Sequence, residues 1–191
     1  ILRHRLTRYR KAEEKAWRDF DGIVAINHSE YDLVRRSVPS ASNTFLCPMG
    51  LDVSQRAYAW NPSSPPRLIY YGGLGSSHNR DAAERCARII MPMVWQVRPT
   101  TALWIVGSNP PQSIRQLASD PRIHVTGFLQ DPGPTLATGS LLLCPWRGAY
   151  GFRSRIIECM AVGLPVVASG EAVAGMNLRH GSGILLTTSE S

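Results

Sequence analysis

The amino-acid sequence predicts an α/β protein built on a doubly wound parallel sheet, preceded by the tail of a second α/β domain. Three observations support this fold class. Short, unbroken apolar runs recur along the chain, as in strands that are buried on both faces of a sheet. Segments with helical spacing separate these runs, and no Asn-Gly hairpin signal joins two of them.

The first 47 residues are expected to form a helix, a strand, a second helix and a second strand. The basic helix covers residues 3–20, with packing positions at Leu6, Tyr9, Ala16, Trp17 and Phe20. The apolar run at 23–26 predicts a strand buried on both faces. Asn27 to Glu30 supply helix-start chemistry for a short helix, and residues 44–47 predict the second strand. The Pro- and Ser-rich stretch 61–66 is the best linker candidate.

After residue 66, strands and helices alternate regularly. Strands are expected at residues 68–71, 103–107, 124–127, 141–144, 165–168 and 183–186. Helices are expected from Arg80 to about Val97, from Pro110 to about Ala118, near 134–137 and over 155–162. Pro92 should kink or shorten the first of these helices. Ligands of such sheets bind beyond the carboxyl ends of the strands, so the candidate loops are 72–79, 107–110, 127–131 and 146–154.

The chain is basic. Its 21 lysines and arginines exceed 14 aspartates and glutamates, which gives a net charge of +7. Such a balance favours anionic partners, namely phosphates, nucleic acid or an acidic membrane surface. Basic residues crowd the segment from Arg3 to Arg18. This first helix therefore either rests on an anionic membrane or is a solvated basic face.

Several classes of protein are disfavoured. No apolar run approaches the roughly 18 residues that a membrane-spanning helix needs. The four cysteines lie far apart, which indicates buried, reduced thiols in a cytoplasmic protein. Neither they nor the histidines have the spacing of a metal site, so no metal is expected. The chain opens with Ile1 and stops at Ser191, and it looks like a fragment cut at both ends.

Two loops contain residues that could bind a phosphate. Gly72 and Gly73 open a glycine-bearing loop between a strand and a helix, where backbone N–H groups can approach an anion. Taken alone, this loop is more typical of a tight turn. Arg147 and Arg153 lie in a second strand-to-helix loop, where guanidinium groups can reach a diphosphate.

Arg155 and Glu158 follow that second loop on one helix face, since they are three residues apart. A carboxylate beside a phosphate site suits a ribose, whose paired hydroxyls can both donate to it. The alternative is an exposed ion pair between the two residues, and the spacing alone favours that alternative.

Residues 145–169 resemble the donor-binding motif of glycosyltransferase family 4, whose members have the GT-B fold. The segment ends in Glu-Cys-Met-Ala-Val-Gly-Leu-Pro-Val-Val-Ala-Ser, close to the family's Glu-Ala-Met-Ala-x-Gly-x-Pro-Val-Val-x-Ser/Thr run. Other landmarks follow in order: the glycine-bearing strand end at 70–73, the strand ends at 105–107 and 125–129, and an interdomain segment at 48–52.

The resemblance implies three regions and an activity. Residues 1–47 would be the end of the amino-terminal acceptor domain, 48–66 the interdomain linker, and 67–191 the nucleotide-sugar donor-binding domain, truncated at its end. The implied activity is a retaining, metal-independent hexosyltransferase that moves a sugar from a nucleotide-diphosphate sugar to a glycan or lipid-linked acceptor. It would serve surface polysaccharide synthesis in the cytoplasm, on the inner face of the plasma membrane. The fragment alone is expected to bind nucleotide weakly and to transfer nothing.

The resemblance also implies roles for particular residues. Those expected to bind the donor diphosphate are Gly72, Gly73, Arg153 and Arg155. Glu158 would hold the ribose hydroxyls, and Gly127, Phe128 and Leu129 would lie near the base. Arg147, Tyr150 and Gly151 would lie near the transferred sugar.

One departure from the family pattern keeps alternatives open. The first acid of the family's Glu-x7-Glu pair would fall at position 150, where this sequence has Tyr150. A subset of exopolysaccharide-associated relatives also lacks that acid. Three hypotheses therefore remain: the transferase, a non-catalytic relative that binds nucleotide sugar, and a basic α/β protein that binds nucleic acid. The motif at 145–169 favours the first two, so nucleic acid is not expected as a partner.

Overall fold

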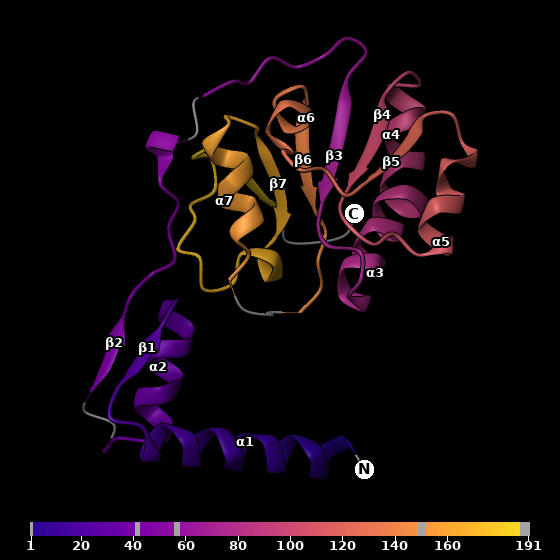
Figure 1. The fold of residues 1–191 in the computed structure, drawn as a ribbon. Helices are drawn as coiled ribbons and strands as arrows, with labels where there is room; N and C mark the ends of the chain where they lie inside the picture. Colours follow the sequence, from indigo (N-terminus) through magenta and orange to yellow (C-terminus); the bar gives the residue numbers. More distant parts are fainter. Residues whose placement is uncertain (1, 41–42, 56–57, 149–151, 188–191) are drawn as a thin grey trace.

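The computed structural model describes residues 2–40, 43–55, 58–148 and 152–187, which form a small amino-terminal unit and a larger unit (Figure 1). The small unit comprises α1 (Leu2–Asp19), β1 (Ile23–Ala25), α2 (His28–Ser37) and β2 (Thr44–Leu46). β1 and β2 pair in parallel, with Val24 opposite Phe45. Asn27 caps α2 as expected, because its side-chain oxygen accepts a hydrogen bond from the Glu30 N–H.

The small unit corrects two expectations. α2 covers one face of its sheet through the buried residue Val34, whereas Val24 and Phe45 on the other face are exposed. The predicted strand at 23–26 is thus not buried on both faces. Of the packing positions predicted on the first helix, Ala16 and Trp17 are half-buried and the following ones are exposed: Leu6, Tyr9 and Phe20. A two-stranded sheet with one covering helix has no apolar layer to place on its second face.

The larger unit contains a six-stranded parallel sheet in the order β5-β4-β3-β6-β7-β8. Its strands are β3 (Arg67–Tyr71), β4 (Ala102–Val106), β5 (Ile123–Gly127), β6 (Leu141–Cys144), β7 (Val166–Ser169) and β8 (Ile184–Thr187). The main helices are α3 (Ser77–Arg85), α4 (Met91–Val97), α5 (Gln112–Arg115), α6 (Gly133–Ala137) and α7 (Ser154–Ala161). These elements confirm the predicted doubly wound sheet.

The core lies on both faces of the central strands. Neighbouring residues of β3 point to opposite faces of the sheet, and Ile69 and Tyr70 are both fully buried. α3 contributes Ala83 to this core, and α7 contributes Ile156. The strand order runs outward from β3 in one direction and from β6 in the other, which places a topological switch point between these two strands.

Pro92 does not shorten its helix, which continues to Val97 as α4. A π-helical turn over Cys86–Ile90 directly precedes it, and the Met91 N–H donates to the carbonyl of Cys86, five residues back. In a regular α-helix, proline lacks the N–H for the backbone hydrogen bond, and its ring collides with the carbonyl one turn earlier. The wider π-helical turn leaves room for the proline ring. The helical path from α3 into α4 is therefore continuous.

Three further expectations concern the cysteines, the linker and the membrane. Cys86, Cys144 and Cys159 are buried free thiols, whereas Cys47 is exposed because it follows the edge of the small sheet. Part of the predicted linker packs on the larger unit, where the Trp60 indole donates to the carbonyl of Gly139 (2.8 Å). Among the described residues, no helix is long and apolar enough to span a membrane.

Candidate functional site

The loops that follow β3 and β6 leave the sheet side by side at the switch point (Figure 1). β3 ends at Tyr71 and continues through a glycine-bearing loop into α3, while β6 ends at Cys144 and continues through a longer loop into α7. The connections from β3 and β6 run to opposite sides of the sheet, so a crevice opens between them at the carboxyl edge. The predicted loop 72–79 and the described ends of the predicted loop 146–154 lie here.

The glycine loop packs against the end of β4 through its backbone. The Gly72 N–H donates to the Val106 carbonyl (3.0 Å), and the Leu74 N–H donates to the Ser108 carbonyl (2.9 Å). A Cβ atom on Gly107 would lie 1.8 Å from the Gly72 carbonyl oxygen, so only glycine allows this approach. Because the Gly72 amide is engaged within the sheet, Gly73 is the better placed of the two predicted glycines to donate to a diphosphate.

Asn79 connects the glycine loop to the loop after β6. Its side-chain amide donates to the Gly73 carbonyl (2.8 Å), and its side-chain oxygen accepts from the Trp146 indole N–H (2.9 Å). The buried Tyr70 hydroxyl donates to the Asn79 backbone carbonyl (2.9 Å). Sequence reasoning missed this residue, although an asparagine in the first turn after a glycine loop is a recognisable local signal.

Replacing Asn79 by alanine is expected to lower the free energy of unfolding by about 2 kcal/mol, because the Trp146 indole and the Gly73 carbonyl lose their shared partner. Urea denaturation of the variant and the parent chain measures this difference. Ser77→Ala, at an exposed position of the same helix, is the matched control and should change stability by less than about 0.5 kcal/mol. Equal stability of the Asn79 variant and its control would contradict the bridging role.

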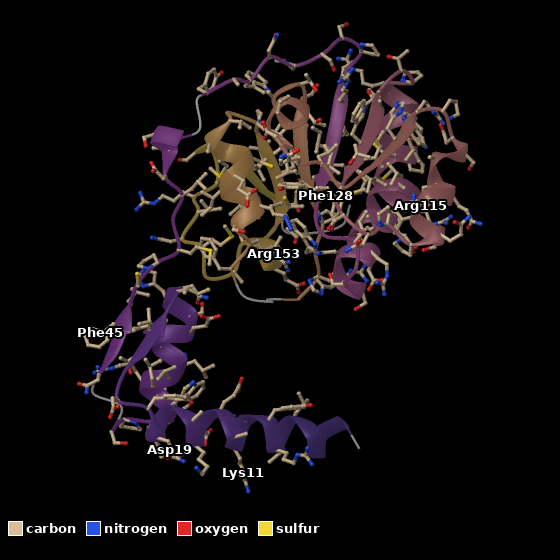
Figure 2. The ribbon with its side chains drawn as sticks, viewed as in Figure 1. Lys11, Asp19, Phe45, Arg115, Phe128 and Arg153 are labelled. Atoms are coloured by element: carbon tan, nitrogen blue, oxygen red, sulfur yellow. The ribbon has the colours of Figure 1, made fainter. Side chains whose placement is uncertain are left out.

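Arg153 contacts two residues of the loop after β6, Trp146 and Gly148 (Figure 2). Its guanidinium group lies 4.7 Å from the Trp146 ring centroid and donates to the Gly148 carbonyl (3.2 Å). The Gly148 N–H donates in turn to the carboxylate of Glu171, which follows β7. The structure thus gives Arg153 a role in shaping the loop, and its predicted contact with a diphosphate stays a prediction.

The predicted sugar-proximal residues are less well defined. Tyr150 and Gly151 lie outside the described residues. Arg147 is exposed and lines a cavity of about 860 Å³ between the α3–α4 helical segment and strands β6–β8, where Arg85 and Glu171 are its charged neighbours. That cavity is mostly apolar, and Arg147 does not line the smaller one that contains Arg155.

Arg155 and Glu158 extend from α7 towards Tyr71, the last residue of β3. The Arg155 guanidinium lies 4.8 Å from the centroid of the Tyr71 ring, and the Tyr71 hydroxyl donates to a carboxylate oxygen of Glu158 (3.2 Å). Ile156 and Cys159 on the same helix are buried in the core, which fixes the orientation of α7. No ion pair joins Arg155 to Glu158 in the part of the chain that the structure describes.

Burial and the neighbouring Glu158 carboxylate raise the pKa of Tyr71 to about 12, against an opposing effect of Arg155. A phenol with a raised pKa keeps its proton across the neutral range. Tyr71 therefore keeps the proton that it donates to the Glu158 carboxylate throughout that range.

A cavity of about 100 Å³ brings five of the eleven predicted residues together. Gly127 has a φ of 73° and turns the chain after β5, so that Phe128 is 76% exposed beside the cavity (Figure 2). Gly73 is close enough to Arg155 that an added Cβ would lie 3.8 Å from the guanidinium. The cavity is lined by Tyr71, Gly73, Val106, Gly107, Ser108, Gly127, Phe128, Leu129, Pro132 and Arg155.

The electrostatic character of this edge favours an anion. Arg155 lines the cavity, Arg153 lies in the loop that leads to α7, and the first turn of α7 contributes the positive end of its dipole. Glu158 is held by Tyr71 beside the cavity. Among the described residues, no group of three His, Cys, Asp or Glu side chains could hold a metal ion.

Comparisons with known proteins identify a family and a common fold. Residues 65–191 match the family model described as glycosyl transferases, group 1. The structure of HepE from Anabaena, solved with UDP and glucose, is similar over 96% of this chain and 54% of the HepE chain. The identity is 19% and the TM-score is 0.70. The match to TarM covers 93% of this chain and 35% of TarM, with 14% identity and a TM-score of 0.66. The match to a glycosyltransferase from Rickettsia africae covers 92% of this chain and 52% of that protein, with 14% identity and a TM-score of 0.65.

At these identities, the likeness to the solved structures concerns the fold. The chain spans about half the length of the HepE structures that it matches. No curated protein sequence matches the chain.

Proposed function

Since this chain belongs to the group 1 glycosyl transferases, we propose that its larger unit binds the nucleoside diphosphate of a sugar donor at the carboxyl ends of β3 and β6. The whole protein would transfer a hexose, with retention, to a glycan or lipid-linked acceptor in surface polysaccharide synthesis. Membership in this family favours the two nucleotide-sugar hypotheses over a basic protein that binds nucleic acid.

One observation carries the proposal: the Arg155 guanidinium lines a glycine-bounded cavity at the switch point, and the Glu158 carboxylate from the same helix is held beside it through Tyr71. Gly73 borders the same space without a side chain that would fill it. Anion-binding and hydroxyl-binding groups are thus adjacent, as a nucleoside diphosphate requires.

Each part of the donor has a proposed partner. The base would lie against Gly127, Phe128 and Leu129, where the exposed Phe128 ring offers a stacking surface. The ribose hydroxyls would donate to Glu158. The diphosphate would meet the Gly73 amide, Arg155, the first turn of α7 and, after a shift of its loop, Arg153. Arg147 and the segment with Tyr150 and Gly151 would approach the sugar.

The proposed chemistry is electrostatic. When the bond between the sugar and the diphosphate breaks, negative charge grows on the departing phosphate oxygens. Fixed guanidinium groups and the helix dipole stabilise that charge without having to reorganise, which is the basis of most electrostatic catalysis. Arg155 is positioned for this by the Tyr71 ring and by the buried face of α7. We propose that these groups replace a metal ion, so that no cofactor is required.

Calorimetric titration with UDP, GDP and ADP in the presence of EDTA tests the donor site. We expect saturable binding of one of the three diphosphates, because the groups that would bind it belong to the chain itself. Magnesium should not strengthen this binding. A folded chain that binds none of the three would contradict the proposal, and binding that requires magnesium would contradict its metal-independent part.

The alternative is a relative that binds nucleotide sugar without transferring it. The observation in its favour is Tyr150, which stands where the family's first paired acid would fall. The full-length protein distinguishes the two. Release of nucleoside diphosphate and glycosylation of an acceptor would support the transferase, whereas binding of the nucleotide sugar with no turnover would support the alternative.

The acceptor side of the proposal involves the small unit. α1 has exposed basic residues, among them Arg8, Lys11 and Lys15, together with the exposed Leu6 and Tyr9. Such a surface suits the anionic inner face of a plasma membrane, where lipid-linked acceptors occur. We propose that the protein is cytoplasmic and peripheral to that membrane. Failure of the full-length protein to sediment with vesicles containing an anionic lipid would contradict this placement.

A further inference from the structure

Tyr71 contacts two charged residues of the candidate site, Glu158 and Arg155. It is the last residue of the central strand β3 and is buried at the switch point. Its hydroxyl donates to Glu158, and its ring lies beneath the guanidinium of Arg155. Tyr71 itself lines the small cavity, so it connects Glu158 to the space that the ligand would occupy.

We propose that Tyr71 is a positioning residue that gives the site its selectivity for a ribose: its hydroxyl orients Glu158 for the sugar hydroxyls while its ring holds Arg155 at the diphosphate. This inference rests on the proposed function, since it assigns a further residue to the same nucleotide site.

The hydroxyl acts by orienting the carboxylate before the ligand arrives. The helix fixes the backbone of Glu158, but the side chain can still rotate about several bonds. The bond from Tyr71 removes much of that freedom and uses one acceptor position of the carboxylate. The remaining positions can still accept from two ribose hydroxyls. A side chain ordered in advance binds more tightly, because its ordering no longer opposes association.

The same bond keeps the two charges of α7 apart. Arg155 and Glu158 are three residues apart on one helix, a spacing at which opposite charges pair. In the structure each contacts Tyr71 instead. Without the hydroxyl, Glu158 would be free to pair with Arg155, and both groups would be withdrawn from the ligand. Tyr71 thus links the ribose contact to the diphosphate contact.

Two substitutions separate the hydroxyl from the ring. Tyr71→Phe removes the bond to Glu158 and keeps the ring under Arg155, whereas Tyr71→Leu removes both. Tyr31→Phe is the matched control, because Tyr31 also lies beneath an arginine, Arg35, but on α2, away from the site. The probes are UDP, or GDP or ADP if the titration above selects one of those, and the 2′-deoxy form of the same diphosphate.

We expect Tyr71→Phe to weaken binding of the ribonucleotide about tenfold and that of the deoxynucleotide at most about twofold. Tyr71→Leu should weaken both, since Arg155 loses its support. Combining Tyr71→Phe with Glu158→Gln should be no worse than Glu158→Gln alone, because the hydroxyl acts through that carboxylate. Thermal unfolding of Tyr71→Phe reports any general loss of structure.

The outcomes separate this inference from the proposed function. A parent chain that binds no diphosphate overturns both. A parent chain that binds, and that Glu158→Gln weakens while Tyr71→Phe does not, overturns only the role of Tyr71. Equal losses for the ribonucleotide and the deoxynucleotide would also overturn it, because a purely structural role would not discriminate between the two sugars.

Discussion

Replacing Glu158 by glutamine is expected to weaken binding of the nucleoside diphosphate about 100-fold, without unfolding the chain. The carboxylate would accept two hydrogen bonds from the ribose, and each bond to a charged group is worth about 1.5–3 kcal/mol. Glutamine has nearly the same shape but carries no charge, and its amide group donates where the carboxylate accepts. Calorimetric titration of both chains measures the change.

Glu13→Gln is the control for this substitution. Glu13 is exposed on α1, so the same chemical change there should leave nucleotide binding as it is. The thermal midpoint of the Glu158 variant should stay close to that of the parent, because the carboxylate is only partly buried. Unchanged affinity in a folded Glu158→Gln chain would remove the ribose contact from the proposal.

Gly107→Ala is expected to destabilise the fold by about 3 kcal/mol and to abolish nucleotide binding. Its new methyl group would lie 1.8 Å from the Gly72 carbonyl oxygen. Because that oxygen belongs to the backbone, no side-chain rotation can relieve the clash. The two loops must therefore move apart. The backbone hydrogen bonds that join Gly72 to Val106 and Leu74 to Ser108 would be strained as a result.

Gly75→Ala is the matched control in the same glycine loop, because a Cβ atom at Gly75 would meet nothing within 4 Å. We expect it to change the free energy of unfolding by less than about 0.5 kcal/mol. Urea denaturation measures stability for both variants, and titration measures binding. If Gly107→Ala were as stable as Gly75→Ala and bound nucleotide normally, the close packing of the two loops would not be needed for the site.

Local patterns in the sequence were sufficient for most of the larger unit. The apolar run at 68–71 became β3, and the run at 141–144 became β6, because a strand buried on both faces must be apolar at successive positions. The candidate loops also followed from a general rule, since parallel sheets place their ligands beyond the carboxyl ends. Gly73 lies in one of these loops, whereas Arg155 lies just beyond the loop 146–154 and was selected through the resemblance of residues 145–169 to the family motif.

The small unit was harder to predict for a physical reason. The run at 23–26 is as apolar as that of β3, yet Val24 is exposed. Apolar composition shows that a strand can be buried, whereas burial itself depends on what packs against it. Cys47 is exposed for a similar reason, because it lies just beyond an edge strand of a two-stranded sheet. Neither outcome can be recognised from a local window.

The alternation of strands and helices, the glycine-bearing loop and the motif at 145–169 can be recognised from local patterns, because these features depend on short-range spacing. Which side chains meet depends on the packing of distant segments. Tyr71 and Glu158 are 87 residues apart, and Asn79 and Trp146 are 67 apart, yet each pair forms a hydrogen bond. These contacts arise because β3 and β6 are neighbours in the sheet, and that strand order results from packing across the whole domain.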